Sequence, residues 1–341
     1  MTRLAKTLEI RTSPHIVSGY DVDTVMFNVV VALAPAAAFA LWAFGWAALL
    51  ALGVAIGSCL AAERAAARVA GKPSPLGDWS AVVTGLLFGL TLPPGLPLWM
   101  VAVGGGITIV VGKAIFGGLG FNPFNPALVG RAVLQAAFPV AMTTWIPAFG
   151  GERFRGLPGS LLALPFASPS YDALSGATPL AAWKFSRQAT EVSDLAFGFV
   201  GGSTGETSGL LILLGGLYLV ARNMMSWRIP VAVLAAVATL ATVLHQLDPA
   251  RHAGAGFMLF SGGLMLGAVF MATDPVTSPI TPRGMWLFGA FIGVLVVVIR
   301  TWGGMAEGVM YAILLGNAVA PLLDRVTQPR VYGTSPPKAK R

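Results

Sequence analysis

Charged side chains are scarce in this sequence. Only 11% of its 341 residues are Asp, Glu, Lys or Arg, whereas a soluble domain usually carries about 25%. Hydrophobic residues make up 55% of the chain, and the mean hydropathy is +0.75. This composition excludes an ordinary soluble enzyme, a disordered protein and a nucleic-acid-binding domain. It predicts a polytopic membrane protein, in which lipid covers the apolar surface.

Cysteine is nearly absent. The single Cys59 excludes an internal disulfide and a cysteine-rich metal or iron–sulfur site within the chain, and leaves open only a half-site shared with a partner. His15, His245 and His252 lack the spacing of metal ligands, so no metal site is expected. Gly104-Gly-Gly106 lies inside an apolar segment and lacks the strand–turn–helix setting of a dinucleotide-binding motif. The sequence therefore offers no NAD-binding fingerprint.

Ten apolar segments follow one another, each approaching the roughly 20 residues that a helix needs to cross a bilayer. They cover residues 24–43, 46–63, 80–93, 97–113, 126–142, 207–222, 229–246, 254–272, 284–301 and 306–323. The third ends at Leu92-Pro93-Pro94-Gly95, and the eighth ends at Ala272-Thr273-Asp274-Pro275. Such interruptions are typical of discontinuous helices that line a site. The predicted fold class is an all-α polytopic membrane protein.

The distribution of Lys and Arg predicts the orientation of these segments. With a cytoplasmic N-terminus and alternating helices, 16 of the 22 basic residues, Arg131 among them, lie on the cytoplasmic side. Residues 1–23 and 324–341 are then cytoplasmic. The polar residues 143–206 form a long periplasmic loop between a first half, 24–142, and a second half, 207–323. Five helices in each half would orient the halves oppositely, as in an inverted repeat.

The periplasmic loop contains the most informative motif, Asp172-Ala-Leu-Ser175-Gly176-Ala177-Thr178-Pro179. Thr178 is a favourable N-cap and Pro179 suits the first helical position, so the pattern predicts a short helix over 180–188. The free N–H groups and positive dipole end at its start would suit a phosphate. The residues by themselves favour the plainer interpretation, an ordinary capped helix in a loop.

A resemblance adds to this interpretation. Asp172–Thr178 resembles, at every position, the recognition sequence of flavin transferases, which attach FMN to a threonine through a phosphoester. Motifs in both halves resemble one family: Asp78-Trp-Ser-Ala-Val-Val-Thr84-Gly85, Leu92-Pro-Pro94, Gly112-Lys113, Phe116-Gly-Gly-Leu-Gly120, Asn122, Phe124-Asn125-Pro126-Ala127, Gly205-Glu206-Thr207-Ser208, Trp227-Arg228-Ile-Pro230, Met271-Ala-Thr273-Asp274-Pro275 and Glu307-Gly308. That family comprises the D component of the Rnf ion-translocating oxidoreductase complex and the B component of the sodium-pumping NADH:quinone oxidoreductase. The short N-terminal segment before Thr24 is similar to the Rnf branch, and the quinone-reductase branch is the alternative.

The resemblance implies a fold, a function and partners. The fold would be about ten transmembrane helices in two inverted five-helix repeats, similar to urea and ammonium channels. Thr178 would carry covalent FMN within the motif Asp172, Ser175, Gly176 and Ala177, and a non-covalent riboflavin would lie among the helices. The complex would couple electron flow between ferredoxin and NAD to Na+ or H+ translocation across the bacterial inner membrane, and the chain would be inactive alone.

The implied partners are the other membrane and peripheral subunits, including a second FMN-carrying subunit and iron–sulfur subunits. A flavin transferase would serve maturation, membrane lipid would surround the helices, and no nucleic acid is expected. The competing hypothesis is a channel-like transporter without a redox cofactor, in which the loop is only a lid. The complete flavinylation motif favours the redox protein, because a channel has no need of it.

Five polar residues at the ends of apolar segments are candidates for an ion pathway: Lys113, Asn122, Asn125, Asp274 and Asp324. The alternatives are cytoplasmic anchoring and loop capping for the first three, and water-exposed helix ends for the two aspartates. One departure from the family concerns the residue after Lys113. The quinone-reductase relatives usually carry Glu there, and this chain has Ala114, so a carboxylate proposed for cation uptake is missing.

Overall fold

The computed structural model describes residues 21–72, 76–165, 177–206 and 208–329, and every regular element within these ranges is helical. The first half contains α1 (Val22–Phe44), α2 (Trp46–Val69), η1 (Leu76–Asp78), α3 (Ser80–Leu90), α4 (Leu98–Ile109), η2 (Val110–Ala114), α5 (Pro126–Ala137) and α6 (Pro139–Met142). The connecting region contains α7 (Pro179–Ala181), η3 (Ala182–Ser186) and α8 (Val192–Phe197). The second half contains α9 (Gly209–Ala221), α10 (Arg228–Leu247), α11 (Ala255–Phe260), α12 (Leu264–Leu266), η4 (Gly267–Met271), α13 (Pro282–Trp302) and α14 (Val309–Thr327).

Helices lie at all ten predicted apolar segments, which confirms the all-helical membrane class. Five of them, α1, α2, α10, α13 and α14, are long and apolar enough to span a bilayer. Shorter apolar helices cover 80–90, 98–114 and 209–221. The fifth segment, 126–142, contains two helices: α5 ends at Ala137 and α6 begins at Pro139, because proline has no N–H to continue the helix.

The eighth segment is interrupted in its middle as well as at its predicted end. Helix α11 ends at Phe260, the backbone of Ser261 is extended, and Gly262 adopts a left-handed conformation with φ +63°. A side chain at Gly262 would collide with the Glu307 carboxylate, so only glycine allows this close approach. The interruption places backbone carbonyls inside the protein, where they need donors.

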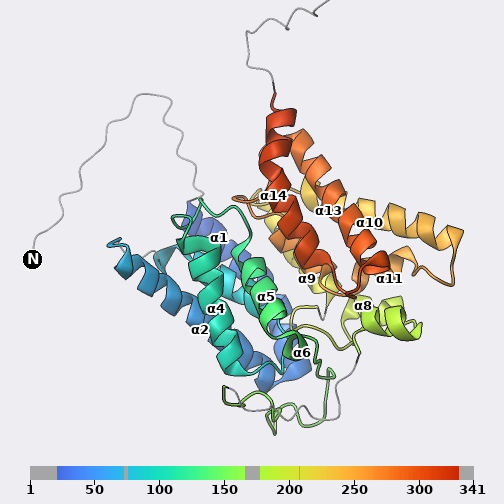
Figure 1. Ribbon diagram of the computed structural model, residues 1–341, viewed down its shortest axis with the longest axis horizontal. Helices are drawn as coiled ribbons and strands as arrows, with labels where there is room; N and C mark the ends of the chain where they lie inside the picture. The colour runs from blue at the N-terminus through green and yellow to red at the C-terminus, as the bar shows by residue number, and fades with distance from the viewer. Residues whose placement is uncertain (1–20, 73–75, 166–176, 207, 330–341) are drawn as a thin grey trace, which may run out of the picture.

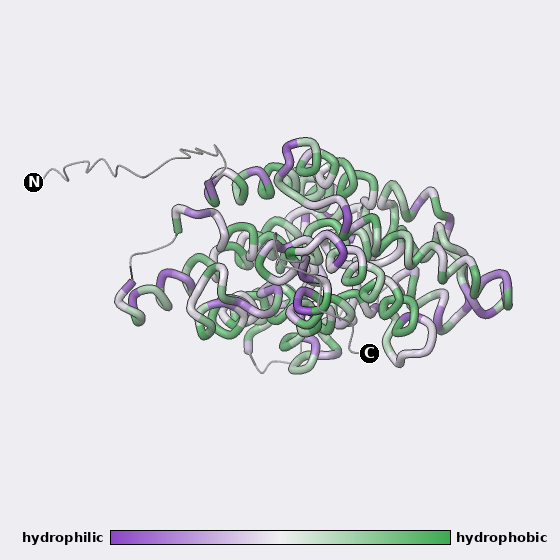
Figure 2. Tube along the Cα trace, turned by 90° about the horizontal axis from the view of Figure 1, so that it is seen from above, coloured by the Kyte–Doolittle hydropathy of each residue, from purple (hydrophilic) through white to green (hydrophobic). Residues whose placement is uncertain are grey.

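The helices form two groups (Figure 1). Helices α1, α2, α4 and α5 lie together, and α9, α10, α13 and α14 form the second group beside them. Contacts of α1 with α9 and of α5 with α14 join the groups. Apolar residues cover most of the helices, and hydrophilic residues gather at helix ends and connections (Figure 2).

Helices α10 and α13 pack closely over most of their length. A Cβ on Gly289 would lie 2.8 Å from the Ile229 carbonyl oxygen, and one on Gly293 would lie 2.6 Å from that of Val233. These glycines let the two backbones touch, which is a common way for membrane helices to associate. Gly289 faces Ile229 and Gly293 faces Val233, so the residue numbers of both helices increase in the same direction. Helices α10 and α13 therefore run parallel and end on the same side of the protein.

Candidate functional site

Thr178 begins a short helix, as the sequence predicts. Its Oγ1 accepts a hydrogen bond from the Ala181 N–H at 3.2 Å, and Pro179 occupies the first helical position. A π-helical turn covers Ala182–Ser186, so the helix ends two residues before the predicted end at residue 188. Ala177 is exposed and Thr178 is half-buried. The predicted motif residues Asp172, Ser175 and Gly176 lie outside the described residues.

Thr178 opens onto a cavity of about 510 Å³, called here the Thr178 cavity. Residues from both halves and from the connecting region line it: Arg131, Gln135 and Met142 from the first half, Met305, Ala306, Glu307, Met310 and Tyr311 from the second, and Thr143, Trp145 and Glu206 from the connecting region. Phe185 of the short helix closes one side. Arg131, which the charge distribution predicts on the cytoplasmic side, belongs to α5 and lines the same cavity as Thr178.

Glu206 is the ionisable group of the Thr178 cavity with the most unusual environment. Its Oε2 accepts a hydrogen bond from the Ser203 N–H at 3.3 Å, and its Oε1 is buried without a partner among the described residues. Burial, reinforced by the negative charge of Glu307, raises the pKa of Glu206 to about 7, although Arg131 and Ser203 act in the opposite direction. This environment favours the protonated form of the Glu206 carboxyl.

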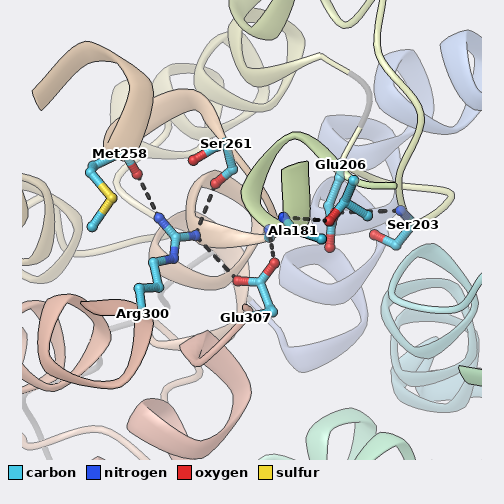
Figure 3. Close-up of polar contacts among 9 residues, drawn as sticks. Ala181, Ser203, Glu206, Met258, Ser261, Arg300 and Glu307 are labelled. Atoms are coloured by element: carbon cyan, nitrogen blue, oxygen red, sulfur yellow. Dashed lines mark hydrogen bonds and ion pairs between the residues drawn. The ribbon is translucent and has the colours of Figure 1, made fainter. Parts of the chain in front are cut away.

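The carboxylate of Glu307 lies on the other side of the short helix. It belongs to a hydrogen-bond network that supplies donors to backbone carbonyls where helix α11 ends. Arg300 donates to the carbonyl oxygens of Met258 at 2.6 Å and Ser261 at 2.9 Å, and contacts Glu307 Oε1 at 3.2 Å. Glu307 Oε2 accepts from the Gly263 N–H at 3.1 Å. In Figure 3, this network lies on one side of Ala181, and Glu206 with Ser203 lies on the other.

Four of the five predicted ion-pathway residues come together at another place. Lys113, Asn122, Asn125 and Asp274 line one small cavity of about 90 Å³ between the two groups of helices. Asp324 does not line it. Its carboxylate accepts from the N–H groups of Ile280 at 3.0 Å and Thr281 at 3.2 Å, at the start of α13, which is a helix-capping role.

Lys113 forms a buried ion pair that sequence reasoning missed. Its Nζ lies 2.5 Å from Glu63 Oε1 and 2.7 Å from Ser80 Oγ, and the two charged side chains are only 3% and 7% exposed. Glu63 thus supplies a carboxylate next to Lys113, which Ala114 cannot. The available signal was a lone carboxylate near the end of the apolar helix α2, which is a functional indication at membrane depth.

Asn125 joins the two halves. Its Oδ1 caps α5 by accepting from the Ala127 N–H at 3.1 Å, and its Nδ2 donates to the Met271 carbonyl at 3.3 Å. Its own N–H donates to Asn317 Oδ1 at 3.2 Å, and Asn317 Nδ2 reaches the Thr277 carbonyl. Asn122 donates to the Phe124 carbonyl, and its Oδ1 is buried without a partner in the described part of the chain.

A family model described as NQR2, RnfD, RnfE family matches residues 9–333, which is nearly the whole chain. The chain belongs to this family. The predicted resemblance is thereby confirmed.

Individual relatives are similar over the same length. The chain is 46% identical over 330 residues to the D component of the ion-translocating oxidoreductase complex of Stutzerimonas stutzeri, and the match covers 92% of each chain. It is 43% identical to the component of the same name from Halorhodospira halophila (strain DSM 244 / SL1), over 95% of each chain. It is 39% identical to the D component of the proton-translocating ferredoxin:NAD(+) oxidoreductase complex of Clostridium ljungdahlii (strain ATCC 55383 / DSM 13528 / PETC), over 95% of this chain and 96% of the relative.

Proposed function

We propose that this chain is the D-type component of a redox-driven, ion-translocating oxidoreductase complex in the bacterial inner membrane, and that it carries FMN on Thr178. Relatives at 39–46% identity over most of the chain are named as such components, which supports the first part. The position of Thr178 at the mouth of a cavity supports the second. On this proposal the chain works only with the partner subunits, which supply the NAD and ferredoxin chemistry.

The Thr178 cavity fits a flavin in size and chemistry. Its volume of about 510 Å³ falls within the range of about 300–1,000 Å³ that is usual for cofactor pockets. Trp145, Phe185 and Tyr311 offer aromatic surface to a flat ring system. Arg131 Nε and Glu206 Oε1 are buried without partners among the described residues, so a donor and an acceptor remain free for the polar edge of a ligand.

When bound, FMN would supply the one- and two-electron chemistry, and the protein would supply position and electrostatics. Thr178 would hold the phosphoester, and the hydrogen bond from Ala181 would fix the direction of its Oγ1. Arg131 would favour negative charge in the cavity. Glu206, with its pKa near neutrality, would take up or release a proton when the charge in the cavity changes.

The remaining parts of the proposal concern the membrane. Ten helices in two inverted repeats would place the Thr178 cavity on the periplasmic side and the Lys113 cavity on the cytoplasmic side. Lys113, Asn122, Asn125 and Asp274 would contribute to the pathway of Na+ or H+, with Glu63 as the partner of Lys113. The Asp324 carboxylate would stabilise the start of α13 by accepting hydrogen bonds from backbone N–H groups. A non-covalent riboflavin among the helices remains part of the proposal, without assigned residues.

A denaturing gel viewed under ultraviolet light tests the flavin. The full chain would be made with an active flavin transferase, beside Thr178→Ala and the matched control Thr143→Ala, whose side chain lines the same cavity. We expect fluorescence in the parent and in Thr143→Ala, and none in Thr178→Ala. A dark band in all three would refute the covalent flavin and favour the channel-like alternative. Fluorescence in Thr178→Ala would place the attachment on another residue.

A further inference from the structure

A second cavity lies on the other side of the helix that Thr178 begins. Ala181 and Phe185 line the Thr178 cavity, whereas Leu180, Trp183 and Lys184 line this second one, which has a volume of about 410 Å³. Its charged and titratable lining residues are Lys184, Arg187, Arg251, His252 and Arg300, and we call it the basic cavity. None of its described lining residues is Asp or Glu.

Two positive charges of the basic cavity have no carboxylate partner among the described residues. Arg251 pairs with Asp248 at 3.3 Å, and Arg300 pairs with Glu307 at 3.2 Å. Lys184 and Arg187, by contrast, bind only backbone carbonyl oxygens among the described residues. The Lys184 Nζ contacts those of Arg300, Gly303 and Met305, and the Arg187 Nη1 contacts that of Arg251 at 2.8 Å. A carbonyl dipole does not neutralise a full charge, so the cavity attracts anions.

Two buried nitrogen atoms at the basic cavity have no hydrogen-bond partner in the described part of the chain. Arg300 is only 5% exposed, and its Nε has no hydrogen-bond acceptor within the described ranges. His252 Nδ1 is also buried and makes no hydrogen bond to a described residue. A buried donor without an acceptor destabilises the folded protein, because it has lost its hydrogen bonds to water. A ligand that carries several acceptor oxygens would satisfy the Arg300 Nε donor and compensate the charges of Lys184 and Arg187 together.

Apolar side chains of two helices form part of the wall of the basic cavity. Ala241, Leu244 and Val297 come from the last turns of the parallel helices α10 and α13. Beyond them, Leu247 is 77% and Trp302 63% exposed. Tryptophans at the ends of membrane helices are typical of the level of lipid head groups. A ligand with an anionic head and apolar chains therefore matches both parts of the surface.

We propose that the basic cavity binds the phosphate head group of an anionic phospholipid, whose acyl chains lie along α10 and α13. Arg187 is the residue best placed to select the anion. It is exposed at the cavity, its guanidinium stacks over Trp183 at 5.9 Å, and only one of its nitrogens is engaged by a described residue. Arginine forms strong charge-assisted hydrogen bonds with phosphate. The lipid would hold the short helix in place from the side opposite Thr178.

Lipid binding to the purified full-length chain tests this site. Native mass spectrometry in detergent would measure the affinities for phosphatidylglycerol and phosphatidylcholine in the parent, in Arg187→Gln, in Arg187→Lys and in Arg155→Gln. Arg155 is an exposed arginine of the same loop that does not line the cavity, so it controls for net charge. Inorganic phosphate would be tested separately by its effect on the melting temperature.

We expect the parent and Arg155→Gln to prefer phosphatidylglycerol. Arg187→Gln should bind it about tenfold more weakly, because one charge-assisted hydrogen bond is lost, and Arg187→Lys should retain part of the preference. Equal affinity for the two lipids in the parent, or unchanged binding in Arg187→Gln, would overturn the proposal. Stabilisation by inorganic phosphate as large as that by phosphatidylglycerol would identify a site for a free anion and would refute the lipid.

Discussion

The ionisation of Glu206 makes the stability of the protein depend on pH. Burial and the charge of Glu307 raise its pKa from 4.5 to about 7 in the folded chain. A carboxyl whose folded pKa is raised binds its proton more tightly in the folded state. Its contribution to stability is therefore fully present below about pH 4.5 and is lost as the pH rises towards 7. A shift of this size corresponds to about 3 kcal/mol, at about 1.4 kcal/mol per pH unit.

Glu206→Gln isolates this contribution, because glutamine stays neutral at every pH. We expect the variant and the parent to melt at nearly the same temperature at pH 4.5. At pH 8 the variant should be more stable by about 3 kcal/mol, or about 4 °C if unfolding entropy is about 2 cal/mol/K per residue. The assay is the melting temperature of the full chain in detergent, followed between pH 4.5 and 8.

The exposed Glu152 offers a matched control. Glu152→Gln removes the same charge from the same loop without a buried carboxyl, so the difference from the parent should not change with pH. If the advantage of Glu206→Gln is the same at pH 4.5 and pH 8, Glu206 is ionised throughout this range. The argument from burial would then be refuted.

Two further predictions concern buried contacts between helices. Glu63→Gln should destabilise the chain by about 3–5 kcal/mol, because it leaves the charge of Lys113 buried without a carboxylate. In a melting experiment, the double variant Glu63→Gln/Lys113→Met should recover most of this loss, and additive losses would contradict the ion pair. Gly293→Leu should force α10 and α13 apart and cost about 3 kcal/mol, whereas Gly57→Leu, at a position with open space, should have little effect on the same measurement. Equal melting temperatures for the two leucine variants would show that the close helix contact does not support the fold.

Local features of the fold followed from the sequence. The apolar segments predicted the positions of the helices, because a membrane helix is formed by one continuous stretch of apolar residues in the sequence. Thr178 and Pro179 predicted the start of the short helix, because capping uses residues that are neighbours in the chain. The motifs around Gly112-Lys113 and Phe124-Asn125-Pro126-Ala127 led to the family, which the comparison with known proteins confirmed.

The pairing of polar groups was decided only by the tertiary structure. Lys113 and Glu63, which form an ion pair, are separated by 50 positions. Arg131 and Glu206, which line the same cavity, lie still farther apart in the sequence, so no local pattern connects either set. The break at Ser261 was missed for the same reason: its free carbonyl is satisfied by Arg300 of another helix. In an apolar environment each buried charge or carbonyl must find a partner wherever the fold brings one. The sequence by itself determined the helices and the family, whereas the packing of distant helices decided which polar groups meet.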